Sequence, residues 1–209
     1  DKKTNYDRVL FSFAKDGAAA VANLRAGEWG DIKVLINGGA SNGKTAGFLV
    51  KVETLSPDLA QVRLFHTSVA RAIATWPTWP GEPGFTGDFE EYLAQKFPTS
   101  TAADFAVLEA GIVSEETYVQ QGLYWEASAV PMLKYIFRNY RPDLAMVGFP
   151  TIDEFQHQFL GLISPVLPNG QPNPAYDNVK VVPGGKDNRV AQRTAFIQRA
   201  YQGADSTLG

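Results

Sequence analysis

The spacing of apolar residues changes from every second position to every third or fourth position along this chain of 209 residues. Early in the chain, Phe48, Val50 and Val52 alternate with their neighbours, and Pro57 follows soon afterwards, which predicts a β-strand over 46–54. Later in the chain, six residues with helical spacing predict one buried face of a long helix: Val119, Leu123, Ala127, Val130, Leu133 and Phe137. The pattern therefore predicts a mixed α/β fold.

Four segments in the first half have the composition of strands, namely 6–14, 31–36, 46–54 and 60–70. The last three are joined by short turns, which favours an antiparallel meander over 31–70 rather than βαβ units. The alanine-rich segment 16–27 is predicted as a helix, because Asp16 is a suitable N-cap and Gly27 a suitable end.

The second half is predicted to alternate loops and helices. Segment 75–87 is rich in Pro, Gly and Trp and indicates a loop, and 88–97 indicates a short helix with acidic residues in its first turn. Ser114 is a suitable cap for a helix reaching about Tyr140, which Pro131 is expected to kink or split.

The remaining residues are predicted as a buried strand, a long surface loop and a final helix. The apolar run 144–149 is flanked by prolines and follows the long helix, an order typical of α/β sheets. Segment 164–186 has the turn residues of a surface loop around one short Val-Lys-Val-Val run. The closing helix carries its apolar side chains on one side: Val190, Phe196, Ile197 and Tyr201.

Composition excludes several kinds of site. The chain has no cysteine, which excludes disulfides, thiol nucleophiles and cysteine-ligated metals. His66 and His157 are its two histidines, so a three-histidine zinc site is impossible within the chain. The net charge of −3 gives no indication of binding to a nucleic-acid duplex, and no apolar run is long enough to predict a membrane span.

The segment from Gly38 to Thr45 matches the letters of a P-loop, G-x-x-x-x-G-K-[ST]. A P-loop must open a helix, because the N-terminal amides and dipole of that helix bind the phosphates. The residues after Lys44 alternate as in a strand. We therefore expect a glycine-rich hairpin loop here, with a nucleotide-binding loop as the least favoured interpretation.

Two further features are expected to be structural. The turn Phe97-Pro-Thr-Ser-Thr101 holds hydroxyl groups without a nearby histidine or acidic cluster to activate them, so Ser100 or Thr101 is predicted to cap a helix. His66 has no potential metal ligand at a useful spacing and is predicted to be a half-buried strand residue with a structural hydrogen bond.

Asp153 and His157 form the strongest candidate site. They directly follow the apolar run 144–149, and α/β folds place ligand sites beyond the ends of their strands. Residues four apart lie on one face of a helix, and carboxylate and imidazole are both zinc ligands. A catalytic zinc needs at least three protein ligands, so the pair alone is an incomplete site.

The stretch from Pro142 to Gly161 resembles the type I phosphodiesterase/nucleotide pyrophosphatase family of the alkaline phosphatase superfamily. In this family an Asp-x-x-x-His follows a strand, and a helix similar to 200–209 comes later. The resemblance covers roughly 115–209 and implies that Asp153 and His157 are metal ligands. It further implies a site with two zinc ions and a threonine nucleophile, acting on phosphoric ester or anhydride bonds.

The sequence also departs from the family. The opening metal-binding Asp, a nucleophile motif in context, the later Asp-His pair and the final His have no counterparts here. The resemblance therefore implies an internal fragment that is inactive alone, with a family-variable insertion over 1–113 and part of the catalytic domain over 114–209. Its expected partners are a small phosphoester substrate and the rest of the parent chain. The sequence leaves the compartment open, and the family favours export.

A non-enzymatic interpretation stays open beside this one. In it, the chain is a binding or interaction module that contacts a carbohydrate or a partner chain through the Trp/Pro-rich loop 75–87 and the meander. Asp153 and His157 would then have a structural role.

Overall fold

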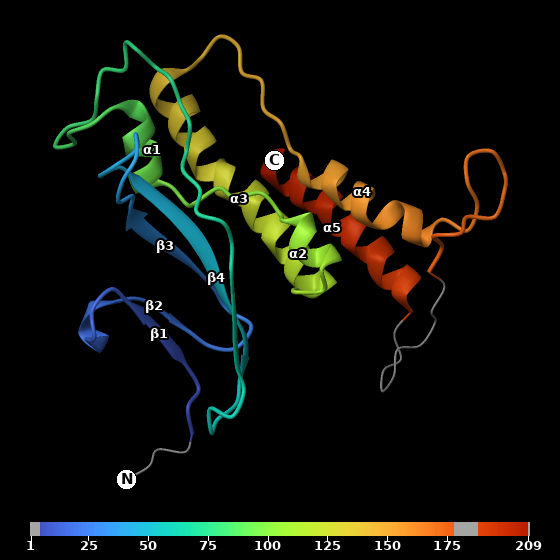
Figure 1. Cartoon of the computed structure of the whole chain (residues 1–209). Helices are drawn as coiled ribbons and strands as arrows, with labels where there is room; N and C mark the ends of the chain where they lie inside the picture. Colours follow the sequence, from blue (N-terminus) through green and yellow to red (C-terminus); the bar gives the residue numbers. More distant parts are fainter. Residues whose placement is uncertain (1–4, 178–187, 209) are drawn as a thin grey trace. The chain divides into compact units, whose positions relative to one another are not determined.

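The computed structural model describes residues 5–177 and 188–208. The chain divides into two compact units, residues 1–101 and 102–209. Helices and antiparallel strands are both present, which confirms the mixed fold class (Figure 1).

The first unit contains two small antiparallel sheets. In the first sheet, β1 (Val9–Ser12) pairs with β2 (Ala20–Leu24). The second sheet has the strand order β3-β4-β5, with the bounds Trp29–Leu35, Thr45–Leu55 and Val62–His66. The expected meander over 31–70 is thus confirmed, including the strand that directly follows Lys44.

The core of the first unit lies between its two sheets. Leu24 of β2, Ile32 of β3 and Val50 and Val52 of β4 are each at most 8% exposed and pack together. Because both sheets contribute to one apolar cluster, neither needs a helix to cover its inner face.

The helix predicted over 16–27 is wrong. Asp16 does act as an N-cap, but only for a 3₁₀ turn over Gly17–Ala19, and the chain then enters β2. Burial alternates along β2, so Ala22 and Leu24 reach the core while β2 pairs with β1. Tertiary pairing here outweighs the helix propensity of alanine.

Helix α1 (Phe89–Lys96) confirms the short helix expected over 88–97, and Asp88 caps it by accepting a hydrogen bond from the Glu91 amide. The preceding segment 75–87 is a loop, as expected. Its aromatic rings pack on α1: Trp76 and Trp79 lie 5.1 and 5.5 Å from Phe89 between ring centroids. The tryptophans are therefore already in contact with the helix of their own unit.

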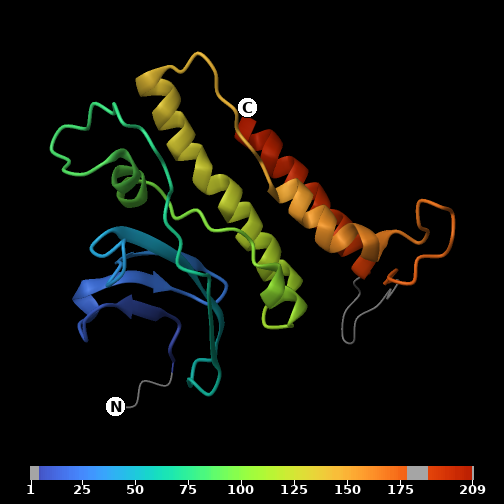
Figure 2. The ribbon, with the colours of Figure 1, turned by 45° about the horizontal axis from the view of Figure 1, so that its top comes forward.

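The described part of the second unit is built from helices. These are α2 (Phe105–Glu109), α3 (Glu115–Tyr140), α4 (Thr151–Ile163) and α5 (Arg189–Leu208). Helices α4 and α5 run side by side, and α3 packs against both (Figure 2). Among the described helices, none has the length and apolar character that crossing a membrane requires.

Aromatic residues form the core of this unit. Tyr118 of α3 lies 5.8 Å from Phe155 and 6.1 Å from Phe159 of α4, and Phe159 lies 5.5 Å from Phe196 of α5. All four side chains are at most 3% exposed. Gly122 lets the ring of Phe155 approach the backbone of α3, because a Cβ at this position would lie 2.6 Å from the ring.

Helix α3 confirms the expected cap and length, since Ser114 accepts a hydrogen bond from the amide of Thr117. Its predicted buried face is only partly correct. Val119 is fully buried, whereas Phe137 is 43% exposed and the buried positions end at Ser128. Pro131 lies inside one continuous helix, so the expected split does not occur.

The buried strand predicted over 144–149 is wrong. The segment has no regular secondary structure, and Leu144 and Met146 are 78% and 91% exposed. A strand needs a neighbour for its backbone hydrogen bonds, and no strand lies in the described part of the second unit. An apolar run is therefore present without a sheet to bury it.

The final helix is confirmed as α5, with Phe196 buried and Tyr201 half-exposed. Arg193 anchors it through ion pairs of 2.6 Å to Glu115 and 2.8 Å to Asp177.

The part of the loop 164–186 that the structure describes is irregular, as expected, and the Val-Lys-Val-Val run at 179–182 lies outside the described residues.

Candidate functional site

Asp153 and His157 lie on the exposed face of α4. The first turn of α4 carries Asp153 and Glu154, where negative charge is favourable to the helix dipole. The four-residue spacing brings Nε2 of His157 to 3.4 Å from Oδ2 of Asp153. Their side chains are 72% and 74% exposed, so the two groups converge in solvent and contribute little to the core.

A groove of about 640 Å³ runs beside this pair. Asp153 and His157 line it together with Leu160 of α4 and with Leu167 and Pro168 of the following loop. An isolated bridge between Val166 and Pro172 shapes that loop. The groove thus combines the carboxylate and the imidazole with further polar side chains, Gln156, Ser164 and Asn173, and with apolar surface from Leu160, Val166 and Leu167.

The pair lacks a third ligand among the described residues. Within residues 5–177 and 188–208, no cluster of three or more His, Asp or Glu side chains has the geometry to hold a metal ion. In this arrangement, no third histidine or carboxylate ligand joins Asp153 and His157 among the described residues.

The threonine-rich turn is held by residues that lie far away in the sequence. The Thr99 hydroxyl donates to Asp31 at 2.6 Å and accepts from Lys33 at 2.9 Å, and Lys33 also donates to the carbonyl of Phe97. Burial lowers the pKa of the Lys33 amine, although Asp31 acts in the opposite direction. Thr99 is 5% exposed and lies directly against Gly47, which leaves no room for a substrate.

This turn does not cap a helix as expected. The N-cap of α2 is Asp104, whose side chain accepts a hydrogen bond from the amide of Ala106. Thr101 is buried at 7% exposure. Asp31 and Lys33 are two residues apart in β3, so their side chains lie on the same face of the strand. This spacing is the sequence feature that could have indicated the cluster around Thr99.

The P-loop interpretation is excluded by the structure. Gly38–Thr45 connects β3 to β4, and Lys44 forms an ion pair of 3.8 Å with Asp88. Because a strand follows Lys44, no helix N-terminus is present there to bind phosphates.

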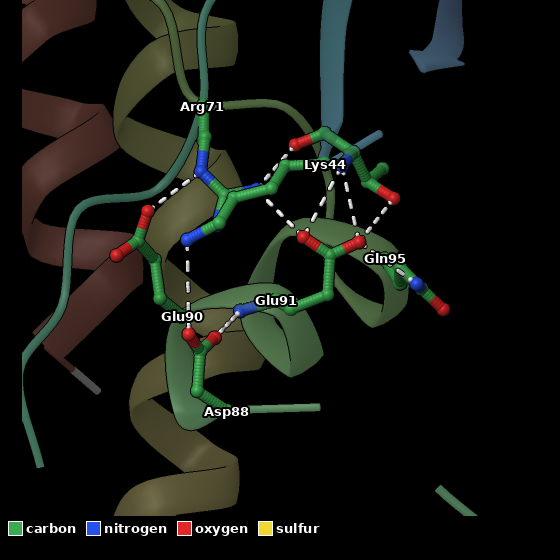
Figure 3. Close-up of polar contacts among 7 residues, drawn as sticks. Lys44, Arg71, Asp88, Glu90, Glu91 and Gln95 are labelled. Carbon is green, nitrogen blue, oxygen red and sulfur yellow. Dashed lines mark hydrogen bonds and ion pairs between the residues drawn. The ribbon is translucent and has the colours of Figure 1, made fainter. Parts of the chain in front are cut away.

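A buried charge cluster joins the start of β4 to α1 (Figure 3). Arg71 donates to Glu90 at 2.6 Å, to Glu91 at 2.7 Å and to the carbonyl of Thr45 at 2.7 Å. Glu91 also accepts from the Thr45 hydroxyl at 2.6 Å and from Gln95 at 2.9 Å. Arg71 is 10% exposed, and no local pattern in the sequence indicates that it meets α1.

This cluster predicts loss of stability in acid. Burial alone would raise the pKa of Glu91, but hydrogen bonds from Thr45, Gln95 and Arg71 outweigh it and lower the pKa to about 2. The stabilisation is complete above the ordinary glutamate pKa near 4.5 and is lost as the pH falls from about 5 towards 2.

We expect Glu91→Gln to lower the free energy of unfolding by about 2 kcal/mol at pH 7, because it removes one of the two carboxylates that pair with Arg71. The measurement is denaturant unfolding of wild type and variant from pH 7 to 2. The difference between them should shrink as the pH falls below 5. A difference that stays constant down to pH 2 would contradict the role assigned to the ionised carboxylate.

His66 lies at the end of β5, with Nδ1 3.0 Å from the carbonyl of Thr67 and its ring 6.1 Å from that of Phe48. The expected structural contact is present, but the side chain is exposed rather than half-buried. His66 and His157 belong to different units and differ in their surroundings, because His66 packs beside a ring and His157 faces a carboxylate.

Comparison with protein-family models, with curated proteins and with solved structures found no match to this chain. The functional argument therefore depends on the chemistry of the α4 face.

Proposed function

We propose that this chain supplies Asp153 and His157 as zinc ligands to a metal-dependent phosphodiesterase or nucleotide pyrophosphatase. In this proposal the enzyme hydrolyses phosphoric ester or anhydride bonds. One observation carries the proposal: an exposed carboxylate and an exposed imidazole converge at 3.4 Å beside a groove of about 640 Å³.

The separation of the two ligand atoms suits zinc. Zinc binds carboxylate oxygen and imidazole nitrogen at about 2.0–2.1 Å, so two ligands at the tetrahedral angle lie about 3.3–3.4 Å apart. The Oδ2 to Nε2 distance of 3.4 Å agrees with this value. Two protein ligands are too few for a catalytic centre, so the proposal requires further ligands from the rest of a parent chain.

A bound pair of zinc ions would neutralise charge on the phosphoryl group and lower the pKa of an attacking hydroxyl. Asp153 and His157 would fix the position of one ion. The nucleophilic threonine is proposed to lie outside this chain, because Thr99 is buried and engaged by Asp31 and Lys33. The apolar surface of the groove would contact the part of the substrate that does not react.

The exposed apolar segment 144–149 supports the same proposal. Leu144 and Met146 are largely exposed, although their residue types favour burial. Packing of further strands of a parent domain against this segment would bury these side chains.

Zinc binding to the isolated chain tests the ligand assignment. The two histidines can be followed separately by NMR, so His66 serves as an internal control. We expect zinc to shift the ring signals of His157 but not those of His66, with weak affinity because two ligands are available. Asp153→Ala should weaken this binding about tenfold, whereas Asp143→Ala, which removes another exposed carboxylate of this unit, should not.

The same sample should not hydrolyse bis-p-nitrophenyl phosphate, even with excess zinc. The metal-ligand assignment would be contradicted if zinc shifted the ring signals of both histidines equally. It would also be contradicted if millimolar zinc shifted neither signal. Zinc-dependent turnover above the buffer rate would instead contradict the proposal that the nucleophile and the remaining ligands lie elsewhere.

A further inference from the structure

Glu126 of α3 is a buried carboxylate that finds no partner among the described residues. The residue is 4% exposed, and neither of its carboxylate oxygens has a hydrogen-bond partner in that part of the chain. The hydroxyl of the neighbouring Thr151 donates its proton to the carbonyl of Gly122 at 3.1 Å. Burial raises the pKa of Glu126, with Thr151 acting in the opposite direction.

A groove of about 480 Å³ lies over this carboxylate, between α3 and α5. Glu126 lines it, and Gly203 of α5 lies beside the carboxylate, since a Cβ there would be in van der Waals contact with Oε1 of Glu126 at 3.5 Å. Leu123, Val130 and Pro131 supply apolar surface to the same groove.

The polar groups of this groove are hydrogen-bond acceptors. The hydroxyls of Ser206 and Thr207 donate to the carbonyls of Gln202 and Gly203 at 2.8 and 3.0 Å, so their oxygens remain free to accept. Pro131 has no amide hydrogen, so the helical hydrogen bond to the carbonyl of Ala127, which also lines the groove, cannot form. Among the described residues that line the groove, none is Lys, Arg or His.

We propose that this groove binds a small organic cation, a protonated amine or guanidinium carried on an apolar body. The ammonium or guanidinium head pairs with the Glu126 carboxylate and donates to the Ala127 carbonyl and to the hydroxyl oxygens of Ser206 and Thr207. The apolar body lies against Leu123 and Val130.

Two physical arguments favour a cationic ligand over a neutral or anionic one. A buried carboxylate without a partner is unfavourable, and a cation that pairs with it removes this cost. A groove with only acceptors can satisfy an ammonium, which only donates, but repels a carboxylate ligand. The oxygens of Glu126 are covered by neighbouring atoms, so binding requires a rotation of this side chain towards the groove.

The test is calorimetric titration of the full chain with butylammonium, using butanol and butyrate as neutral and anionic ligands of similar shape. We expect butylammonium to bind at least about tenfold more tightly than either, because only the ammonium forms a charged hydrogen bond with the carboxylate. Parallel titration with butylguanidinium identifies which head group is preferred.

Glu126→Gln should lose this preference, whereas Glu109→Gln, which removes an exposed carboxylate of the same unit, should retain it. Thr207→Val keeps the shape of the side chain and removes one acceptor at a partly exposed helix position, so it should weaken binding several-fold even if Glu126→Gln does not fold. Equal affinity for butylammonium and butanol, or unchanged binding in both groove variants, would overturn the proposal.

Discussion

In a full-length parent enzyme, His157→Ala is expected to lower kcat/KM at least about 100-fold and to reduce bound zinc, with an unchanged thermal midpoint of the zinc-free protein. The reason is the position of the side chain. His157 is 72% exposed and meets Asp153 at 3.4 Å, so its removal takes a ligand from the proposed centre without opening a cavity in the core. Asp153→Ala is expected to behave in the same way.

The measurement combines specific activity, zinc content and the thermal midpoint of the zinc-free protein for each variant. Asp143→Ala is the matched control, because it removes an exposed carboxylate that lies outside the α4 pair. A structural role for the pair predicts the reverse pattern, with a lower midpoint and normal activity per folded molecule. Normal zinc content and activity in His157→Ala would therefore refute the proposed function, while leaving the groove at Glu126 untouched.

Gly122→Ala is expected to destabilise the second unit by about 2–3 kcal/mol, although alanine is the better helix former. A Cβ at this position would lie 2.6 and 2.8 Å from two ring carbons of Phe155. Phe155 is fully buried between Tyr118 and Phe159, so its ring has little room to move. The helices α3 and α4 must then separate, which weakens the whole aromatic core.

Gly161→Ala is the matched control for this substitution. Gly161 lies inside α4, and a Cβ added there would meet no described atom within 4 Å, so alanine should raise stability by up to about 1 kcal/mol through helix propensity. Thermal and denaturant unfolding of both variants gives the comparison. A Gly122→Ala variant as stable as Gly161→Ala would show that the ring of Phe155 does not limit the approach of the two helices.

The elements that were correctly predicted have strong local signals. The strand β4 follows from alternation at Phe48, Val50 and Val52, and α3 follows from a capping serine and a long helical period. The helix α1 has an aspartate cap and an acidic first turn. These features involve residues that are close together in the sequence, so they can be recognised without knowledge of tertiary contacts.

The two wrong predictions of a helix or strand, over 16–27 and 144–149, depend on neighbouring elements. The segment over 20–24 has helix-forming alanines but becomes β2, because pairing with β1 and burial of Leu24 stabilise it more than its own propensity. The run 144–149 has the composition of a buried strand, yet no strand in the described part of its unit can pair with it. An apolar composition indicates that a segment favours burial, but it does not determine which other segment packs against it.

The candidate sites divide in the same way. The sequence placed Asp153 and His157 on one helical face, because the spacing of four residues needs nothing beyond the helix itself. The structure alone brought Arg71 to Glu91, Asp31 to Thr99 and Glu126 under α5. Each of these arrangements joins residues from separate elements, and their approach is decided by how apolar surfaces pack and by which buried charges find partners.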